Sequence, residues 1–60
     1  MKLREWILTG TAEEGNETRP TRVLTTPEAP RSVAVAKMYK IIPEKYRFCV
    51  GIKKGKIVEV

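Results

Sequence analysis

Histidine and aspartate are absent from this chain of 60 residues, and Ser32 is its only serine. A Ser-His-Asp or Cys-His arrangement therefore cannot be assembled. Glu13, Glu14 and Glu17 supply carboxylates, but their polar, glycine-bearing segment is too mobile for preorganised acid–base chemistry. No phosphate-binding glycine loop is present either, because Gly51-Ile-Lys-Lys-Gly55 is typical of a hairpin. The sequence predicts that the protein is not an enzyme and has no small-molecule substrate.

Cysteine is nearly absent, since Cys49 stands alone. One thiol cannot form an internal disulfide, and without histidine there is no ligand set for a zinc site. We expect no metal and no cofactor, and a thiol buried as a small hydrophobe in a reducing, cytoplasmic setting. Long apolar runs are missing as well, so the sequence predicts neither a secretory signal nor a membrane span.

The short chain limits the size of the core. A chain of this length buries only about 60% of the surface that its unfolded form exposes, so we expect a single small domain over residues 1–60 with a thin core. Aspartate and glutamine are missing and asparagine occurs once, whereas lysine, arginine and glutamate are abundant. This thermophile-like composition is common in proteins from hot environments.

Positive charge is concentrated in the second half of the chain. Residues 1–30 carry four Lys and Arg against five Glu, a net of −1, and residues 31–60 carry eight against two, a net of +6. Together they give the +5 of the whole chain. A concentrated positive field attracts polyanions, and phosphate backbones are the commonest of these. The pattern favours a basic nucleic-acid-binding protein.

Two strands are expected in the first half. Residues 2–9 end at Gly10 and read as a strand with apolar residues on both faces, and residues 21–26 form a short β-branched run that fits a second strand. Residues 10–20 are polar and without period, which predicts a mobile loop between them. The two strands would form a wide hairpin.

A helix is the favoured interpretation of residues 31–42. Apolar residues from Ala34 to Ile42 follow helical spacing, and Pro43 would end the helix. It would start either at Thr26-Pro27-Glu28 or after Pro30 with Ser32 as the cap. A strand is the competing interpretation, because Val33 to Ile41 also alternate.

Residues 45–52 have the clearest alternation in the chain. Tyr46, Phe48, Val50 and Ile52 would face the core, with Lys45 and Arg47 on the other side. Lys53-Lys54-Gly55 would turn into a last strand over residues 56–60. The predicted fold is α+β, an antiparallel sheet in β-β-α-β-β order with one helix packed on it.

The candidate binding residues are the cations of the second half and one aromatic. A solvated face that only keeps the protein in solution would have the same charges, but the asymmetry along the chain favours phosphate binding. Trp6 could stack on a base, since its strand is apolar on both faces. The predicted nucleic-acid-binding set is Lys37, Lys40, Lys45, Arg47, Lys53, Lys54, Lys56 and Trp6.

Residues 38–48 (Met-Tyr-Lys-Ile-Ile-Pro-Glu-Lys-Tyr-Arg-Phe) resemble part of the archaeal ribosomal LX family. That family has an aliphatic-Tyr helix end, a tight turn and a Lys-His-Arg-aliphatic strand. Tyr46 stands at the histidine, Pro43 at a turn glycine and Lys40 at a serine. The resemblance covers about half the chain and implies an α+β ribonucleoprotein component docked on ribosomal RNA, with Lys45 and Arg47 among the contacts.

Three classes of function follow. The first is a small non-enzymatic protein that binds RNA phosphates through residues 37–56, and a ribosomal protein would be one example. The second is a viral or regulatory module that binds a partner protein, and the third is a dimeric DNA-binding regulator. Exposed aromatic residues beside the basic residues would favour RNA, and a long uncovered strand edge or a two-fold interface would favour the others.

Overall fold

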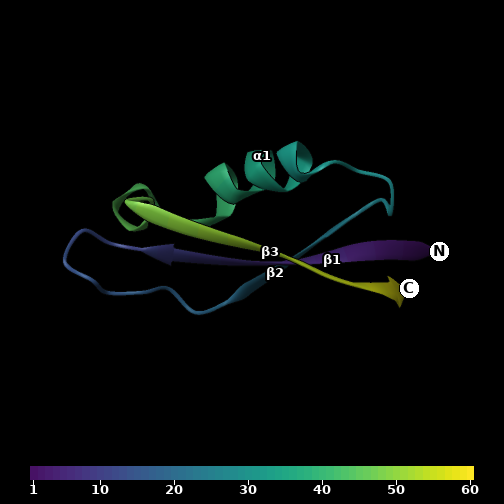
Figure 1. Cartoon of the computed structure of the whole chain (residues 1–60), viewed down its shortest axis with the longest axis horizontal. Coiled ribbons are helices and arrows are strands. Elements are labelled where there is room, and N and C mark those ends of the chain that lie inside the picture. Colours follow the sequence, from purple (N-terminus) through teal and green to yellow (C-terminus); the bar gives the residue numbers. More distant parts are fainter.

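The computed structural model describes all 60 residues as an elongated α+β body of 39 × 17 × 14 Å (Figure 1). Its elements are strand β1 (Lys2–Thr11), strand β2 (Thr21–Thr25), helix α1 (Arg31–Ile41), a single 3₁₀ turn η1 (Glu44–Tyr46) and strand β3 (Cys49–Glu59). The strands form an antiparallel sheet in the order β2-β1-β3. α1 covers one face of this sheet, and the opposite face is open.

The central strand β1 supplies the middle of the core. Alternate residues of a strand point to opposite faces of the sheet, so Trp6 and Leu8 point toward α1 while Glu5 and Ile7 point away. Leu8 is fully buried, and Trp6 is 4% exposed. The core cluster consists of Trp6, Leu8, Val23, Ala34, Met38 and Ile42.

Trp6 is both buried and hydrogen-bonded. Its indole Nε1 donates to the hydroxyl of Thr25 on β2 at 2.8 Å, so the one polar atom of the ring is satisfied inside the core. Thr25 is itself 5% exposed. The large ring therefore supports the structure and presents no face to solvent, which corrects its assignment as a base-stacking residue.

α1 confirms the helical interpretation of this segment over the strand. It begins after Pro30, whose extended conformation precedes the first helical residue, and no side chain caps it, so the expected Ser32 cap is wrong. Ala34 and Met38, one turn apart, face the sheet. The helix ends where the Ile42 N–H donates to the Met38 carbonyl at 2.8 Å and Pro43 follows.

The predicted hairpin at Lys53-Lys54-Gly55 is wrong, because β3 continues through it. β3 pairs with β1 on both sides of Gly55, so the sheet has three strands instead of four. The pairing moves from Arg4–Ile57 to Trp6–Lys54, so one extra residue of β3 bulges opposite Glu5. Glycine is required there because an added Cβ would lie 2.9 Å from the Glu5 carbonyl oxygen. The Arg4 guanidinium donates to the Gly55 carbonyl at 2.9 Å and so satisfies an acceptor at the bulge.

The predicted core face is right at three of its four positions and wrong at Phe48. Val50 and Ile52 pack against the core, but Phe48 is 69% exposed. The alternation fails before Cys49 because η1 replaces the expected start of the strand, and Tyr46, which packs partly on the core, belongs to that turn. Cys49, expected to be buried, is exposed.

The segment between β1 and β2 is folded back on itself. The Ala12 N–H donates to the Asn16 carbonyl at 2.7 Å, and the Thr18 N–H donates to the Gly10 carbonyl at 2.9 Å. Ala12 is 4% exposed, so the segment has an apolar anchor that its composition does not reveal. Its mobility stays a prediction.

The open face of the sheet contains no aromatic residue. Its partly exposed apolar side chains come from alternate positions on the three strands: Leu3, Ile7, Leu24 and Val58. Arg22 and Glu5 form a 3.4 Å ion pair across it. RNA-binding sheets that stack bases do so with aromatic side chains on the strands, so this face lacks what such a platform needs.

Candidate nucleic-acid interface

Two aromatic and two cationic side chains gather where α1 ends and β3 begins. Pro43 ends the helical segment, η1 makes one turn, and the chain then enters β3 along the sheet edge. Tyr39 is 58% exposed and Phe48 is 69% exposed. We call Tyr39, Lys45, Arg47 and Phe48 the aromatic-basic end.

Arg47 ties this end together. Its Nε donates to the Ile42 carbonyl at 3.1 Å, and its guanidinium carbon lies 5.2 Å from the Tyr39 ring centroid. A cation just beyond the helix end, bonded to a carbonyl there, also interacts favourably with the negative end of the helix dipole. Arg47 thus holds Tyr39 in place while part of its donor fork stays free for a ligand.

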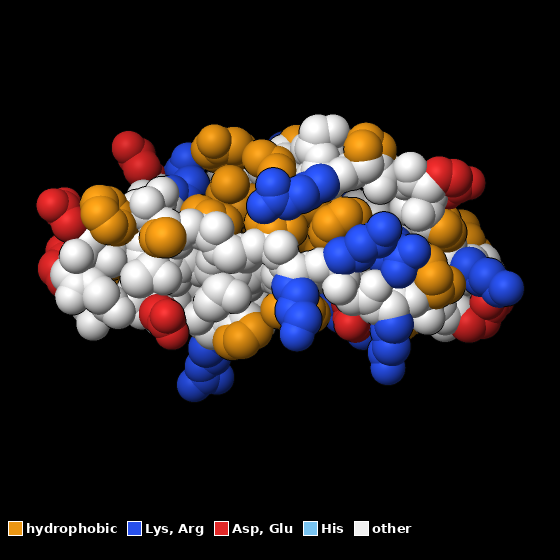
Figure 2. All heavy atoms as spheres, in the orientation of Figure 1, with side chains coloured by type: hydrophobic (Ala, Val, Ile, Leu, Met, Phe, Trp, Pro, Cys, Tyr) orange, Lys and Arg blue, Asp and Glu red, His pale blue; other side chains and the backbone are white.

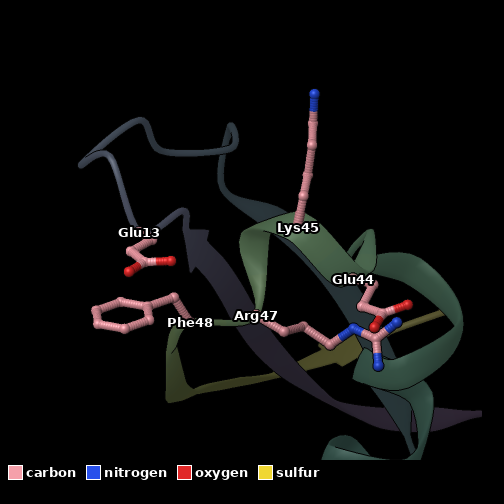
Figure 3. Close-up of a pocket in the computed structure, with 5 residues that line it drawn as sticks. All are labelled: Glu13, Glu44, Lys45, Arg47 and Phe48. Atoms are coloured by element: carbon pink, nitrogen blue, oxygen red, sulfur yellow. The ribbon is translucent and has the colours of Figure 1, made fainter.

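Lys45 is exposed and belongs to η1. Its ammonium lies 5.1 Å from the Tyr46 ring centroid, a distance at which a cation is attracted to the ring. Figure 3 shows its side chain extended away from the ribbon. A flexible point charge in this position suits contact with a phosphate group.

A hollow of about 660 Å³ opens between these residues, lined by Glu13, Glu44, Lys45, Arg47 and Phe48. In Figure 3 the Glu13 carboxylate and the Phe48 ring lie on one side of it, and Arg47 extends toward Glu44 on the other. Two carboxylates face two cations, so the formal charges of the lining cancel. The hollow is therefore not a phosphate cradle by charge alone.

The concentrated positive charge lies farther along β3. Lys53, Lys54 and Lys56 are exposed on this strand, whose outer edge has no neighbouring strand. Lys53 pairs with Ile7 and Lys54 with Trp6, so the two point to opposite faces of the same edge. Figure 2 shows Lys and Arg side chains spread over the face that contains β3. We call these three residues the lysine edge.

None of the Lys and Arg side chains of residues 31–60 is paired with a carboxylate. The two ion pairs of the molecule join Arg22 to Glu5 and the N-terminus to Glu59. No ion pair holds these cations, and along the lysine edge no carboxylate offsets the positive charge, whereas at the aromatic-basic end Glu13 and Glu44 offset Lys45 and Arg47. The positive charge of the lysine edge remains available to an anionic partner.

The predicted site residues are only partly brought together. Lys45 and Arg47 lie at the aromatic-basic end, just before β3. Lys53, Lys54 and Lys56 lie farther along the chain, on β3 itself. Lys37 lines a different hollow, with Met1 and Ala29 among its neighbours, and Lys40 is exposed in the last turn of α1. Trp6 is in the core and leaves the set.

The exposure of Tyr39 and Phe48 was missed. Phe48 fits the alternation of residues 46–52, a pattern that normally indicates burial, whereas Tyr39 fits an alternation only in the strand interpretation that α1 overturns. The signal that could have found them is the proline at position 43, which separates the helix from the strand and interrupts the alternation on both sides.

No helix is long and apolar enough to cross a membrane, and no three metal-ligating side chains come together. The fold and these surfaces define a small basic α+β protein with an exposed aromatic and cationic end. No protein-family model, curated protein or solved structure matches the chain significantly. The likeness of residues 38–48 to the LX family therefore stays a prediction.

Proposed function

We propose that this protein binds single-stranded RNA, or the unpaired parts of a folded RNA, through the aromatic-basic end and the lysine edge. The observation that carries the proposal is the exposure of two rings near cations: Tyr39 lies under Arg47, and Phe48 lines the hollow that Lys45 and Arg47 also line. Exposed aromatic rings next to cations are the combination by which proteins stack unpaired bases and hold their phosphates.

The two surfaces follow one another along the chain, separated by the first residues of β3. Phe48 directly precedes β3, and the extended rise of about 3.3 Å per residue places Lys53 about 16 Å and Lys54 about 20 Å farther along the strand. A strand of RNA whose bases stack at the aromatic-basic end would continue along the lysine edge, where each ammonium can meet a phosphate. The stacked bases fix the position, and the lysines supply a salt-dependent affinity that is independent of sequence.

The experiment is a titration of single-stranded RNA of mixed sequence at several salt concentrations. We expect a dissociation constant in the micromolar range or weaker and a steep loss of affinity as salt rises. Charge reversal of Lys45, Lys53 and Lys54 together should weaken binding at least tenfold. It should also reduce the slope of log affinity against log salt by about 2, since each lost phosphate contact removes about 0.7.

The matched control reverses Lys2, Arg31 and Lys37, which changes the net charge equally but lies outside both surfaces. It should retain most of the affinity and of the salt slope. If both triple variants lose the same RNA affinity, binding depends on net charge alone and the two surfaces have no special role. Unchanged binding in the first variant would overturn it.

A partner protein is the second candidate, because the outer edge of β3 is uncovered along 11 residues. An extended peptide can add a strand to such an edge through main-chain hydrogen bonds. Acidic side chains would complement the lysine edge. Copurification from native lysate separates the two functions, since nuclease should release an RNA-dependent complex and leave a protein complex intact.

A ribosomal role would be the particular form of RNA binding that the LX resemblance implies. In that case the partner is structured ribosomal RNA, with Lys45 and Arg47 among the contacts. Cosedimentation with large ribosomal subunits tests this form separately. Its failure would leave binding to other RNA unaffected.

A further inference from the structure

The hollow at the aromatic-basic end has the chemistry of a base-binding site more than that of a phosphate site. Its charges cancel, and it is a broad depression, largely open to solvent, on which the Phe48 ring is exposed. Figure 3 shows the Phe48 ring and the Glu13 carboxylate on the same side of it. The ring offers a stacking surface, and an ionised carboxylate only accepts hydrogen bonds.

We infer that this hollow takes an unpaired guanine base, stacked on Phe48 and read by Glu13. The inference rests on the proposed function and adds to it a base preference and the residue that determines it. The Watson–Crick edge of guanine carries two adjacent donors, N1–H and the N2 amino group. These can bond to both oxygens of one carboxylate, as an Arg fork does.

The other bases match Glu13 less well. Adenine and cytosine present one amino group beside a ring nitrogen that accepts, and this acceptor would face a carboxylate oxygen. Uracil presents a single N3–H between two carbonyl oxygens. Each of them therefore makes at most one hydrogen bond to Glu13 and brings at least one acceptor against the negative charge, so recognition of two donors at once selects guanine.

The phosphates of the same RNA have separate partners. Lys45 extends away from the ribbon, and the lysine edge begins five residues after Phe48. Glu13 also lines a neighbouring hollow that includes Lys45 and Asn16. Guanine selection and phosphate binding are thus performed by different side chains, which makes them separable by mutation.

The test uses short uridine oligoribonucleotides that differ only in one central base. Guanosine should bind about tenfold more tightly than adenosine, cytidine or uridine, as expected for one bidentate pair. Inosine, which lacks the N2 amino group, should fall between guanosine and the rest. Glu13→Gln should abolish the preference while binding of the all-uridine RNA is kept or improved, because a negative charge beside the RNA is removed.

Glu17→Gln is the matched control, since it removes the same charge from the same segment and lines none of the hollows. It should keep the guanosine preference. Equal binding of all four RNAs by the parent protein, or a preference that survives Glu13→Gln, would overturn the inference and leave the proposed function standing. Failure of every RNA to bind would instead refute the proposed function itself.

Discussion

Arg47 is stacked on Tyr39 across the turn that joins α1 to β3, with 5.2 Å between the guanidinium carbon and the ring centroid. Eight positions separate the two residues in sequence, and Pro43 and η1 bring them together. The same guanidinium donates to the Ile42 carbonyl, so one side chain closes the helix and orients an exposed ring. The contribution of the Arg47 charge can be tested separately from that of its hydrogen bond and its contact with Tyr39.

Arg47→Lys should separate these contributions. Lysine keeps the charge but loses the Nε donor and the planar stack on Tyr39. We expect the free energy of unfolding to fall by about 0.5–1.5 kcal/mol, the usual value of one such hydrogen bond, and the salt slope of RNA binding to stay the same. Urea denaturation and salt titrations measure both. Lys45→Arg, the control, should change the free energy of unfolding by less than about 0.5 kcal/mol. If it lowers that free energy as much as Arg47→Lys does, the Arg47 contacts to Ile42 and Tyr39 do not stabilise the fold.

Phe48→Ala should leave the fold almost unchanged, because most of this ring is in solvent. We expect a change in the free energy of unfolding below about 1 kcal/mol, whereas Leu8→Ala in the core should cost about 2–5 kcal/mol. RNA affinity should fall in the Phe48 variant, since base stacking on an aromatic ring contributes about 1–3 kcal/mol. Thermal melts together with RNA titrations test the pair. A Phe48 variant that unfolds as readily as the Leu8 variant would place the ring in the core.

Gly10→Ala should be destabilising for a steric reason. A Cβ at this position would lie 2.6 Å from the Tyr46 carbonyl oxygen and 2.6 Å from Cγ2 of Ile42, so β1 and η1 could not approach as they do. Overpacking of this kind typically costs about 1–3 kcal/mol. Gly51→Ala is the control, because its Cβ would meet nothing closer than 4.0 Å. There we expect no loss or a gain of about 0.4–1 kcal/mol from the stiffer unfolded chain, and similar losses at both positions would refute the argument.

Trp6 gives an internal reporter, since it is the only tryptophan. Its buried ring should emit at short wavelength, resist quenching by acrylamide and keep its emission when RNA binds. A base stacked on the indole would quench it strongly. Marked quenching by saturating RNA would therefore restore Trp6 to the interface and contradict the buried position.

Much of the fold could be predicted from local pattern. The two faces of residues 2–9 identified β1, a β-branched run identified β2, helical spacing identified α1, and Pro43 marked the end of the helix. These signals depend on residues close in sequence. The α+β class with an antiparallel sheet and one helix followed from them.

The remaining errors concern contacts between distant residues. Gly55 is typical of a turn and of a bulge alike, and only the pairing of β3 with β1 decides between them. The alternation from Tyr46 to Ile52 is a sound strand pattern, but Tyr46 and Phe48 precede the strand, and of the four residues Phe48 alone fails to pack on the core. Trp6 could be assigned to either face until the register with β2 placed it opposite Val23 under α1.

The candidate site was predictable in its charge but not in its aromatic residues. The cations of the site could be predicted because the second half of the chain has an excess of them and charged side chains are almost always exposed. This holds for Lys45, Arg47 and the lysine edge. Whether Tyr39 and Phe48 are buried depends on how much sheet the helix can cover. Tyr39 lies on α1 outside the face formed by Ala34 and Met38, and Phe48 lies between η1 and β3, where it stays 69% exposed.

The bulge at Gly55 limits how far the sheet can grow. A straight strand from a second molecule could pair in register with β3 before the bulge or after it, but not along both segments at once, since the extra residue shifts the pattern of donors and acceptors. Lys53, Lys54 and Lys56 would also meet their own like charges in any stack of identical chains. Edge-to-edge assembly into fibrils is thereby opposed by backbone geometry and by charge, and the one glycine that permits the bulge helps to keep a protein with an 11-residue edge strand from aggregating.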